Sequence, residues 1–522
     1  MTERFARPLH VAPLLALVAL AGCASVREPP QDLATRHVGA PEQFTETDRQ
    51  DGVTSDEVAV GWLTSLGDPV LTGLVREAWE HNPDLYVAAA RFEEAAARLR
   101  VAGSYLLPTL DATGDASYTN YDGSTDTEVY SIGAEVSWEV DLWGRLRSDR
   151  AAARRTAEAV GLDYMQARHS LAAMVAEGYY AIVTAKQQLE IDRLLLEAER
   201  FTEVTTRQRV DAGLGTSLDG DLAESSVRLA EASVQQDLAA LREARRAMEL
   251  LLGRYPSAEL DGAPDTLPKI EDGPLAVGVP SQLLERRPDV RSAELRVDAA
   301  YYDVESARAA RLPSLTLSAD ATQFFDPSEF VSSVAAGIVA PLFQGGRLQA
   351  EQEAANARQR QALGEFASVA LQAFGEVENA LSNEHHLRLR EASLALASER
   401  LVRASDAAIN RYDQGLLTIL DLQQIRRTDY STRSLLLGVR FGQIRQRLNL
   451  YLALGGPVVT IDEDSADATA QADVLDERFP DPDKASFSGE LSVGVDPGAQ
   501  GEANEQDEVD EQVEAKEKTN GG

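Results

Sequence analysis

The sequence predicts a mainly α-helical protein with a smaller β part, arranged as two copies of one unit. Three observations carry this prediction. Short motifs recur in the second half of the chain with unchanged spacing, two pairs of long segments lack proline, and a segment of alternating polar and apolar residues precedes each pair. Each copy is therefore expected to contain a short helix, a β hairpin and a long helical hairpin.

The internal repeat is recognised by its register. The stretch RVDAGLGTSLD at 209–219 recurs as RYDQGLLTILD at 411–421, and a Gly-Arg-Leu motif at 144–146 recurs at 346–348. Pro83 and Pro108 are separated by the same interval as Pro288 and Pro313, and Gly213 and Gly253 by the same interval as Gly415 and Gly455. Chance matches do not keep register over such a span, so a duplicated unit is predicted.

The first 22 residues are interpreted as a signal peptide. Two arginines precede an apolar run at 11–20, which is shorter than the ~20 residues of a spanning helix. Small residues then precede Cys23, the one cysteine of the chain, as in a lipoprotein signal. We expect the Cys23 thiol to be acylated, with ordinary cleavage near a chance or buried cysteine as the alternative. Ala24 follows instead of aspartate, which predicts the outer membrane.

The charge of the chain limits its partners. It holds 85 acidic and 50 basic residues, a net charge of −35, so repulsion from phosphate argues against nucleic acid. Residues 462–522 contain 19 Asp and Glu but only 4 Lys and Arg. Such a segment buries too little apolar surface to offset its ordering entropy. We therefore predict a disordered acidic tail at 456–522.

The long segments at 145–210 and 347–412 are predicted to be helices. Each is rich in helix-forming residues, and a glycine-containing turn leads to a second proline-free run of about 35 residues. A helix of ~65 residues is roughly 100 Å long, which suits a path across the periplasm. Apolar residues at sevenfold spacing predict coiled-coil packing: Val175, Ile182, Leu189 and Leu196, and Leu387, Leu394 and Leu401.

The segments 109–143 and 314–343 are predicted to be β hairpins. Both alternate with a period of two, have aromatic residues near their ends, and are joined at turns containing Asp122-Gly123-Ser124 and Asp326-Pro327-Ser328. This pattern is typical of transmembrane strands, with a soluble hairpin packed on the helices as the alternative. Four strands cannot close a barrel, so a membrane-spanning form must oligomerise; three copies would supply twelve strands.

These features divide the chain into consecutive segments. The predicted limits are a signal peptide at 1–22, a lipid-anchored N-terminal segment at 23–70, repeat 1 at 71–253 with its helical tip near 210–221, a linker at 254–287, repeat 2 at 288–455 with its tip near 412–423, and the tail at 456–522.

Several of these residues together resemble a known family. The segment VPSQLLERRPDVRSAE at 279–294, the motif ending at Cys23, the paired Gly-Arg-Leu motifs and the turn from Tyr412 to Asp421 are similar to the outer membrane factor family that includes TolC and OprM. The similarity is to its lipoprotein branch, which serves resistance-nodulation-division efflux pumps, and spans roughly residues 55–457.

The resemblance implies a fold and a set of partners. It implies a homotrimer with a 12-strand outer-membrane β-barrel, continued by a long periplasmic α-helical barrel. A periplasmic membrane-fusion adaptor and an inner-membrane pump of the resistance-nodulation-division type would be its partners. No cofactor is implied other than the covalent lipid on Cys23.

The resemblance also implies where the functional residues lie. Asp219, Asp421 and Tyr412 would line the constricted aperture, where six carboxylates per trimer would favour cations. Capping of each helix by its aspartate is the alternative reading, and it is compatible with pore lining. The turn glycines Gly213 and Gly415 would form the tip and contact the adaptor.

The arginines of the tip leave alternatives open. Arg209 and Arg411 would belong to the adaptor-contacting tip, and each is either an ion-pairing group or a solvated charge on the helix surface. The sequence departs from TolC at Leu417, where TolC has a latch arginine, and at Gln424, where TolC has a second aspartate. The TolC gating network is therefore not expected to transfer whole.

Enzyme activity is not expected. The six histidines are scattered, and no metal spacing, nucleophile motif or phosphate loop occurs: His10, His37, His81, His169, His385 and His386. The sequence therefore predicts the outer membrane channel of a tripartite efflux pump, a passive duct for small molecules such as drugs. Channels for heavy-metal cations or for type I protein secretion, and a non-channel coiled-coil lipoprotein, are the alternatives.

Overall fold

The computed structural model describes most of the chain between its two terminal segments. The described residues are 26–30, 32–35, 38–49, 53–54, 61–120, 127–270, 275–325, 328–456 and 458. The predicted signal peptide, the acylation site Cys23, most of the two strand joins and the acidic tail from residue 459 onward lie outside these residues.

The same order of elements occurs twice, as the repeat predicts. The first copy contains α4 (Pro69–His81), α5 (Pro83–Ser104), β2 (Thr109–Thr119), β3 (Thr127–Val140), α6 (Arg145–Asp211) and α7 (Ser217–Leu251). The second contains α8 (Pro280–Arg286), α9 (Pro288–Ala309), β5 (Ser314–Phe325), β6 (Ser328–Val339), α10 (Arg347–Asp413) and α11 (Ile419–Ala453). Helices α6 and α10 both have 67 residues, and α7 and α11 both have 35. The prediction of a mainly helical protein with a small β part is confirmed.

The short helices begin where proline favours a helix start. Pro83 and Pro288 occupy the first turns of α5 and α9, where a missing N–H has no helical partner to lose. Asn82 caps α5 through its side chain, and the same side chain donates to the carbonyl of Leu251 at 2.9 Å. This bond ties the start of α5 to the end of α7.

Gly253 makes this junction possible. Its φ is 71°, and a Cβ atom there would lie 2.3 Å from the carbonyl oxygen of His81. No side chain fits at that distance, so the repeated glycine after each long hairpin is required by close backbone approach.

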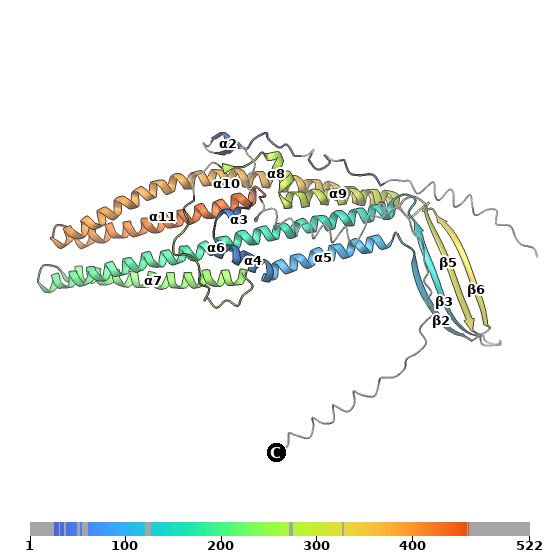
Figure 1. Ribbon diagram of the computed structural model, residues 1–522, viewed down its shortest axis with the longest axis horizontal. Coiled ribbons are helices and arrows are strands. Elements are labelled where there is room, and N and C mark those ends of the chain that lie inside the picture. Colours follow the sequence, from blue (N-terminus) through green and yellow to red (C-terminus); the bar gives the residue numbers. More distant parts are fainter. Residues whose placement is uncertain are drawn as a thin grey trace, which may run out of the picture. The chain divides into compact units, whose positions relative to one another are not determined.

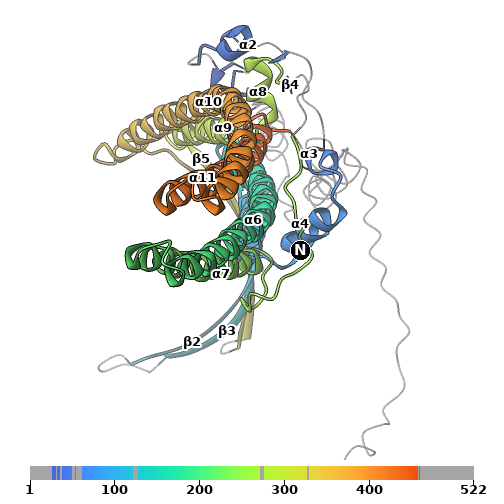
Figure 2. The same ribbon diagram turned by 90° about the vertical axis from the view of Figure 1, so that its left-hand side faces the viewer.

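Helix α6 is central to the bundle. It packs against α5 and α9 towards the sheet and against α7 and α11 towards the tips. In Figure 1 the long helices run side by side, with the turns of the helical hairpins at one end and the strands at the opposite end. Figure 2 views the same helices from the hairpin tips. Of the predicted heptad residues, Val175, Ile182 and Leu189 are buried. The second series, which begins at Leu387, is only partly buried within one chain.

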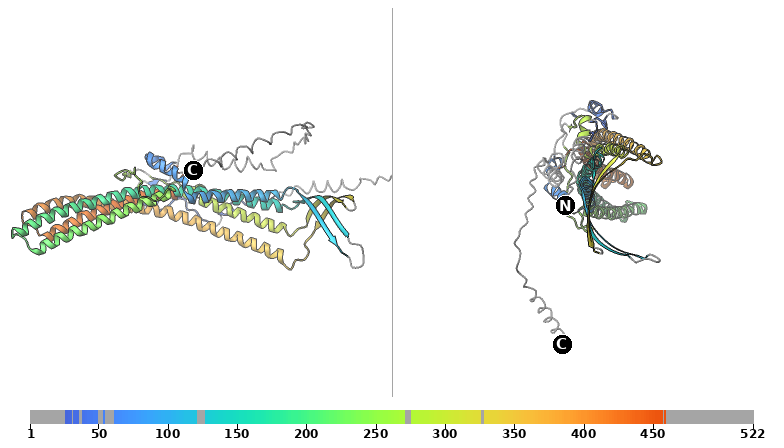
Figure 3. Two further views of the ribbon diagram at one scale, coloured as in Figure 1. Left: turned by 90° about the horizontal axis from the view of Figure 1, so that it is seen from below. Right: turned by 90° about the vertical axis from the view of Figure 1, so that its right-hand side faces the viewer.

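The four long strands form one antiparallel sheet in the order β2-β3-β5-β6. Thr109 pairs with Ser137, Val140 with Leu315, and Ser314 with Val339, so the two hairpins join through β3 and β5. Strands β2 and β6 are exposed along their whole length. Figure 3 shows the sheet from two further sides. A hairpin covered by the helices, the alternative prediction, does not match these exposed strands.

Smaller elements lie beside the middle of the long helices. They are α2 (Thr45–Arg49), β1 (Val53–Thr54), α3 (Trp62–Ser65) and β4 (Leu275–Ala276), with β1 and β4 pairing in parallel. The Glu378 carboxylate of α10 accepts the backbone N–H groups of Thr45 and Glu46, which fixes the start of α2. The sequence did not predict these elements, because each is short and held by distant residues.

Candidate functional site

The two hairpin tips have the same backbone. After α6, the N–H of Gly213 donates to Val210 and that of Leu214 donates to Arg209, at 2.9 and 2.8 Å. After α10, Gly415 and Leu416 repeat these bonds with identical distances. Both glycines have a φ of 72°, which is the left-handed conformation of this type of helix end. The repeated glycines therefore fix two equivalent turns.

Thr216 and Thr418 cap the helices that return from these turns, and Asp219 and Asp421 are the third residues of these helices. The backbone N–H of Asp219 donates to Thr216 Oγ1 at 3.3 Å, and the Asp219 carboxylate accepts from the Thr216 backbone N–H at 2.9 Å. Asp421 and Thr418 form the matching side-chain pair, at 2.7 Å. The bonds from Thr216 lower the pKa of Asp219, so this carboxylate stays ionised near neutral pH. Both aspartates thus lie in the first turn of a helix and bond to its capping threonine, while pore lining stays a prediction.

Tyr412 joins the two hairpins. Its hydroxyl lies 2.7 Å from the Thr206 hydroxyl of α6, and both side chains are buried. Arg209 lies over the Tyr412 ring, with its Cζ 5.1 Å from the ring centroid, and donates to the Tyr412 carbonyl at 2.9 Å. Arg209 is therefore a bonded group of the seam, whereas Arg411 is exposed on the helix surface.

A second polar contact lies farther along the same seam. Arg426 of α11 is buried, and its guanidinium donates to the Ala198 carbonyl at 2.8 Å and to the Thr202 hydroxyl of α6. Burial raises the pKa of the neighbouring Glu199, against the opposing effect of Arg426 and Arg427. Arg426, Thr202 and Thr206 were not predicted from the sequence. The signal available for them is a polar residue at a helix position that faces the neighbouring helices.

Apolar side chains surround the tyrosine at the tip. Ala408, Tyr412, Ile419 and Leu422 form a buried cluster, and Leu417 packs against it. Leu417 therefore contributes packing at a position where a TolC-like latch would need a cation. The contacts between the two hairpins at the tip include the Tyr412–Thr206 hydroxyl pair, the Arg209 contacts, this cluster, and a bond from the Gln423 side chain to the Leu222 carbonyl at 3.3 Å.

The RRPD motif acts at the middle of the bundle. Arg287 is buried, binds the Asp289 carboxylate with two nitrogens, and lies 2.7 Å from Glu376 of α10. Its guanidinium also donates to the Ala453 carbonyl at the end of α11. One arginine thus connects the start of α9 to both long helices of its repeat.

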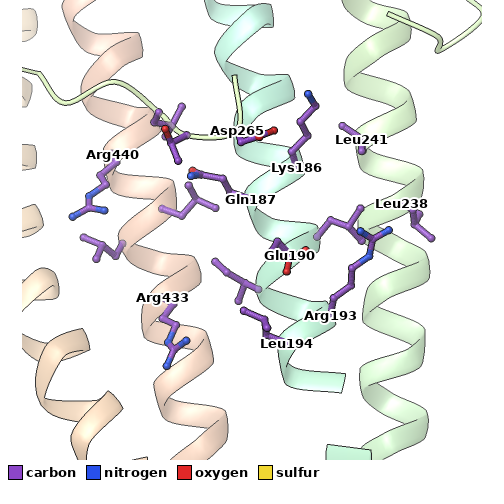
Figure 4. A pocket seen from close by; sticks show the side chains of 16 residues that line it. Lys186, Gln187, Glu190, Arg193, Leu194, Leu238, Leu241, Asp265, Arg433 and Arg440 are labelled. Atoms are coloured by element: carbon purple, nitrogen blue, oxygen red, sulfur yellow. The ribbon is translucent and has the colours of Figure 1, made fainter. Parts of the chain in front are cut away.

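A groove of about 910 Å³ lies between α6, α7 and α11, beside the segment at 265–267. Figure 4 shows Lys186 and Glu190 on α6 and Arg433 and Arg440 on α11 among the side chains that line it. Three of its four cations are bonded: Arg433 to Asp429 at 2.8 Å, Arg440 to Glu391 at 3.0 Å, and Lys186 to the Ala263 carbonyl at 2.9 Å. Arg193 is the fourth, and Glu190 and Asp265 bring two carboxylates to the same lining. The lining of this groove is therefore of mixed charge.

Within the described residues, no three His, Cys, Asp or Glu side chains gather where they could hold a metal ion. None of the helices described has both the length and the apolar content needed to cross a membrane.

A family model described as "Outer membrane efflux protein" matches residues 74–254 and 279–456. The chain is 31% identical over 421 residues to the pyoverdine export outer membrane protein OpmQ of Pseudomonas aeruginosa, covering 76% of this chain and 87% of that protein. It is 28% identical over 466 residues to the cation efflux system protein CusC of Escherichia coli K12, covering 86% and 99%.

The fold is similar to a solved channel. The structure of the outer-membrane channel OprN matches with a TM-score of 0.75 at 28% identity, covering 84% of this chain and 99% of that one. The sequence relatives and this structure agree on the same class of protein.

Proposed function

This chain belongs to the outer membrane efflux protein family, and from that premise we propose that three copies of it form a closed export duct across the outer membrane and periplasm. The chain is an outer membrane efflux channel and not an enzyme, and it is one component of an efflux system. The proposal concerns the number of copies, the barrel, the gate, the partners and the cargo.

The observation that carries the proposal is the sheet with two unpaired edges. No described strand pairs with the outer side of β2 or of β6. Backbone groups without partners are too costly in lipid, so a membrane-crossing sheet of this kind needs neighbours. Three four-stranded sheets supply twelve strands. Because β2 and β6 run in opposite directions, pairing β6 of one copy with β2 of the next keeps an antiparallel pattern around the ring.

Exposed apolar side chains support the same arrangement. Val334 and Ile338 on β6 are 88% and 73% exposed in a single chain, as expected for a surface that meets lipid or a second copy. Helices α7 and α10, which lie at the two ends of the row of long helices, also carry exposed leucines, among them Leu229 and Leu389. Neighbouring copies would cover these leucines.

We propose the tip as the gate of the duct. Asp219, Asp421 and Tyr412 form the aperture, and the turns at Gly213 and Gly415 with Arg411 present the surface that an adaptor contacts. Two aspartates per chain give six carboxylates in a trimer, which favours cations in a narrow pore. Arg209 acts in this proposal through its contacts to Tyr412, which hold the two hairpins together.

The partners and cargo follow from the family and its relatives. We propose a periplasmic membrane-fusion adaptor and an inner-membrane pump of the resistance-nodulation-division type as partners, with small molecules such as drugs as cargo. The named relatives export pyoverdine and cations, so heavy-metal cation efflux is the second candidate. Protein secretion has no comparable support among them.

Acylation at Cys23 completes the proposal. Several acyl chains on one cysteine would give stable attachment to the membrane, whereas a single chain binds only marginally. Cys23→Ser should abolish labelling with radioactive palmitate while the barrel keeps much of the protein in the outer membrane. Unlabelled wild-type protein that retains its signal peptide would contradict this part.

The assembly is tested on detergent-purified full-length protein. Native mass spectrometry should give three subunits, and reconstitution in planar bilayers should give discrete KCl conductance steps. The proposed function would be overturned if a monomer were the sole species. It would also be overturned if the protein showed no conductance with the tip either open or closed.

A further inference from the structure

A second groove, of about 950 Å³, lies between α6, α10 and α11. It is separate from the groove beside residues 265–267. With 3.6 residues per helical turn, Gly438 and Arg445 fall on one side of α11 and Leu437 and Arg440 on the other. The two grooves therefore lie on opposite faces of the same helix.

The second groove lies on the face of α11 that the segment at 265–267 does not cover. Residues 265–267 line the first groove and not the second. If the face that carries this segment pointed to the axis of a tube, the segment would obstruct the duct. In a trimeric duct, the second groove therefore faces the lumen, and this placement rests on the proposed function.

Two glycines keep this groove open. Gly438 and Gly442 lie one turn apart within the 35-residue helix α11, where each glycine costs about 1 kcal/mol relative to alanine. A Cβ atom at Gly438 would meet no heavy atom within 4 Å, so packing within the chain does not require glycine there. The absent side chain widens the groove instead.

The groove carries cations that are available to a ligand. Arg390 is exposed and has no ion-pair partner among the described residues. The nearest carboxylate to Arg445 is Glu177 at 4.0 Å, the outer limit for an ion pair. His386 lies in the same wall, and Asp192 is the one carboxylate among the lining residues described. An excess of cations is notable in a chain with a net charge of −35.

Polar and apolar groups accompany these cations. Asn383 and Gln446 bring amide donors to the groove, while Leu387 and Leu435 bring apolar surface. Arginine binds carboxylates through paired, charge-assisted hydrogen bonds, and the apolar residues would contact a carbon skeleton. A small organic molecule with a carboxylate matches this combination.

We propose that this groove is a binding site for small organic anions within the duct, with Arg390 and Arg445 holding the carboxylate. The site lies far from the tip along α11, so a bound anion would be held before it reaches the outer membrane end. In the trimer, the six carboxylates at the tips would then attract cations. The three cationic grooves farther along the duct would bind anions.

The test is fluorescence anisotropy with the full-length trimer in detergent. Carboxyfluorescein is the anionic probe, and rhodamine 123, a xanthene methyl ester of similar size without a free carboxylate, is the comparison. Wild type should bind carboxyfluorescein more tightly, and Arg390→Gln and Arg445→Gln should each weaken it about fivefold, the loss of one charge-assisted bond at a partly exposed site. Arg440→Gln, on the opposite face of α11, should leave the affinity unchanged.

A second variant tests the groove by shape. Gly438→Leu replaces a poor helix former with a good one where space is free, so the trimer should melt no lower than wild type and should lose carboxyfluorescein binding. Equal affinity for both probes, or unaltered binding in the Arg390→Gln/Arg445→Gln double variant, would overturn the site. KCl conductance distinguishes the two proposals: its absence contradicts the duct, while intact conductance without anion binding contradicts only the groove.

Discussion

The hydroxyl groups of Tyr412 and Thr206 lie 2.7 Å apart across the two helical hairpins, in a buried contact close to both tips. The bond lies between segments 206 residues apart in the chain. Separation of the hairpins at the tip must break it, together with the Arg209 contacts.

Tyr412→Phe should loosen the closed tip. The change removes the hydroxyl but keeps the ring beneath Arg209, at a cost of about 1 kcal/mol, or about fivefold in the ratio of open to closed channels. Single-channel recordings should show longer open periods. Thr206→Val should have a similar effect, and the double variant should add little, because both remove one bond. Tyr430→Phe, farther along α11, is the control; identical gating in all variants would exclude this bond from the gate.

Asp219→Asn and Asp421→Asn should reduce cation selectivity. Both carboxylates accept hydrogen bonds from the capping threonines, and the side-chain oxygen of asparagine can accept the same bonds, so trimer stability should stay close to wild type. Reversal potentials in a KCl gradient should shift towards zero, with a larger shift in the double variant, and block by multivalent cations should weaken. Glu259→Gln, an exposed carboxylate distant from the tips, is the control. Unchanged selectivity in the double variant would leave the aspartates as first-turn partners of the capping threonines alone.

Arg287→Ala should destabilise the fold near the middle of the bundle. It leaves Glu376 and the Ala453 carbonyl without their buried cationic partner, and losing one partner of such a contact costs about 3 kcal/mol. Thermal melting followed by circular dichroism should show a lower midpoint. Arg291→Ala, which removes an exposed pair with Glu294, should change it little. Equal midpoints for both variants would mean that the Arg287 contacts contribute no net stability.

Truncation after Ile461 should leave assembly and export intact, whereas truncation after Gly456 should not. Val458 is fully buried against the cluster that contains Trp62, and its carbonyl accepts the Leu63 N–H at 3.1 Å. Val458→Ala in the full-length chain should lower the free energy of unfolding by about 2 kcal/mol. This variant distinguishes the loss of Val458 packing from the loss of the residues that follow Gly456. Failure of the longer truncation to form trimers would give the acidic tail a structural role.

His169 should make the protein less stable in mild acid. Burial, and then the nearby Arg168, lower the pKa of His169 to about 4 from 6.5. Between these values the unfolded chain binds a proton that the folded chain does not, so stability present above pH 6.5 is lost as the pH falls to about 4. The loss is on the order of 3 kcal/mol. In urea titrations, His169→Leu should remove this part of the pH dependence of stability, and His81→Gln, at an exposed histidine, should not. If the stability of His169→Leu depended on pH as steeply as that of wild type, His169 would not be its source.

The sequence alone determined the repeated architecture. The unchanged spacing of the motifs predicted the duplication, and the proline-free runs predicted the long helices. Alternation of polar and apolar residues predicted four strands whose positions agree with β2, β3, β5 and β6. The glycines at 213 and 415 determined the turns, because only a left-handed residue closes a helix in that way. These features depend on local chemistry, which neighbouring residues are sufficient to specify.

Only the tertiary structure decided which polar side chains meet. Arg209 and Arg411 occupy equivalent repeat positions, yet Arg209 is bonded to Tyr412 and Arg411 is exposed. Periodicity gives the face of each helix but not its axial position against a helix 200 residues away, and a shift of one turn would exchange every partner. The contact between Arg426 and Thr202 and the buried environment of Arg287 depend on that alignment, which packing of the whole bundle sets.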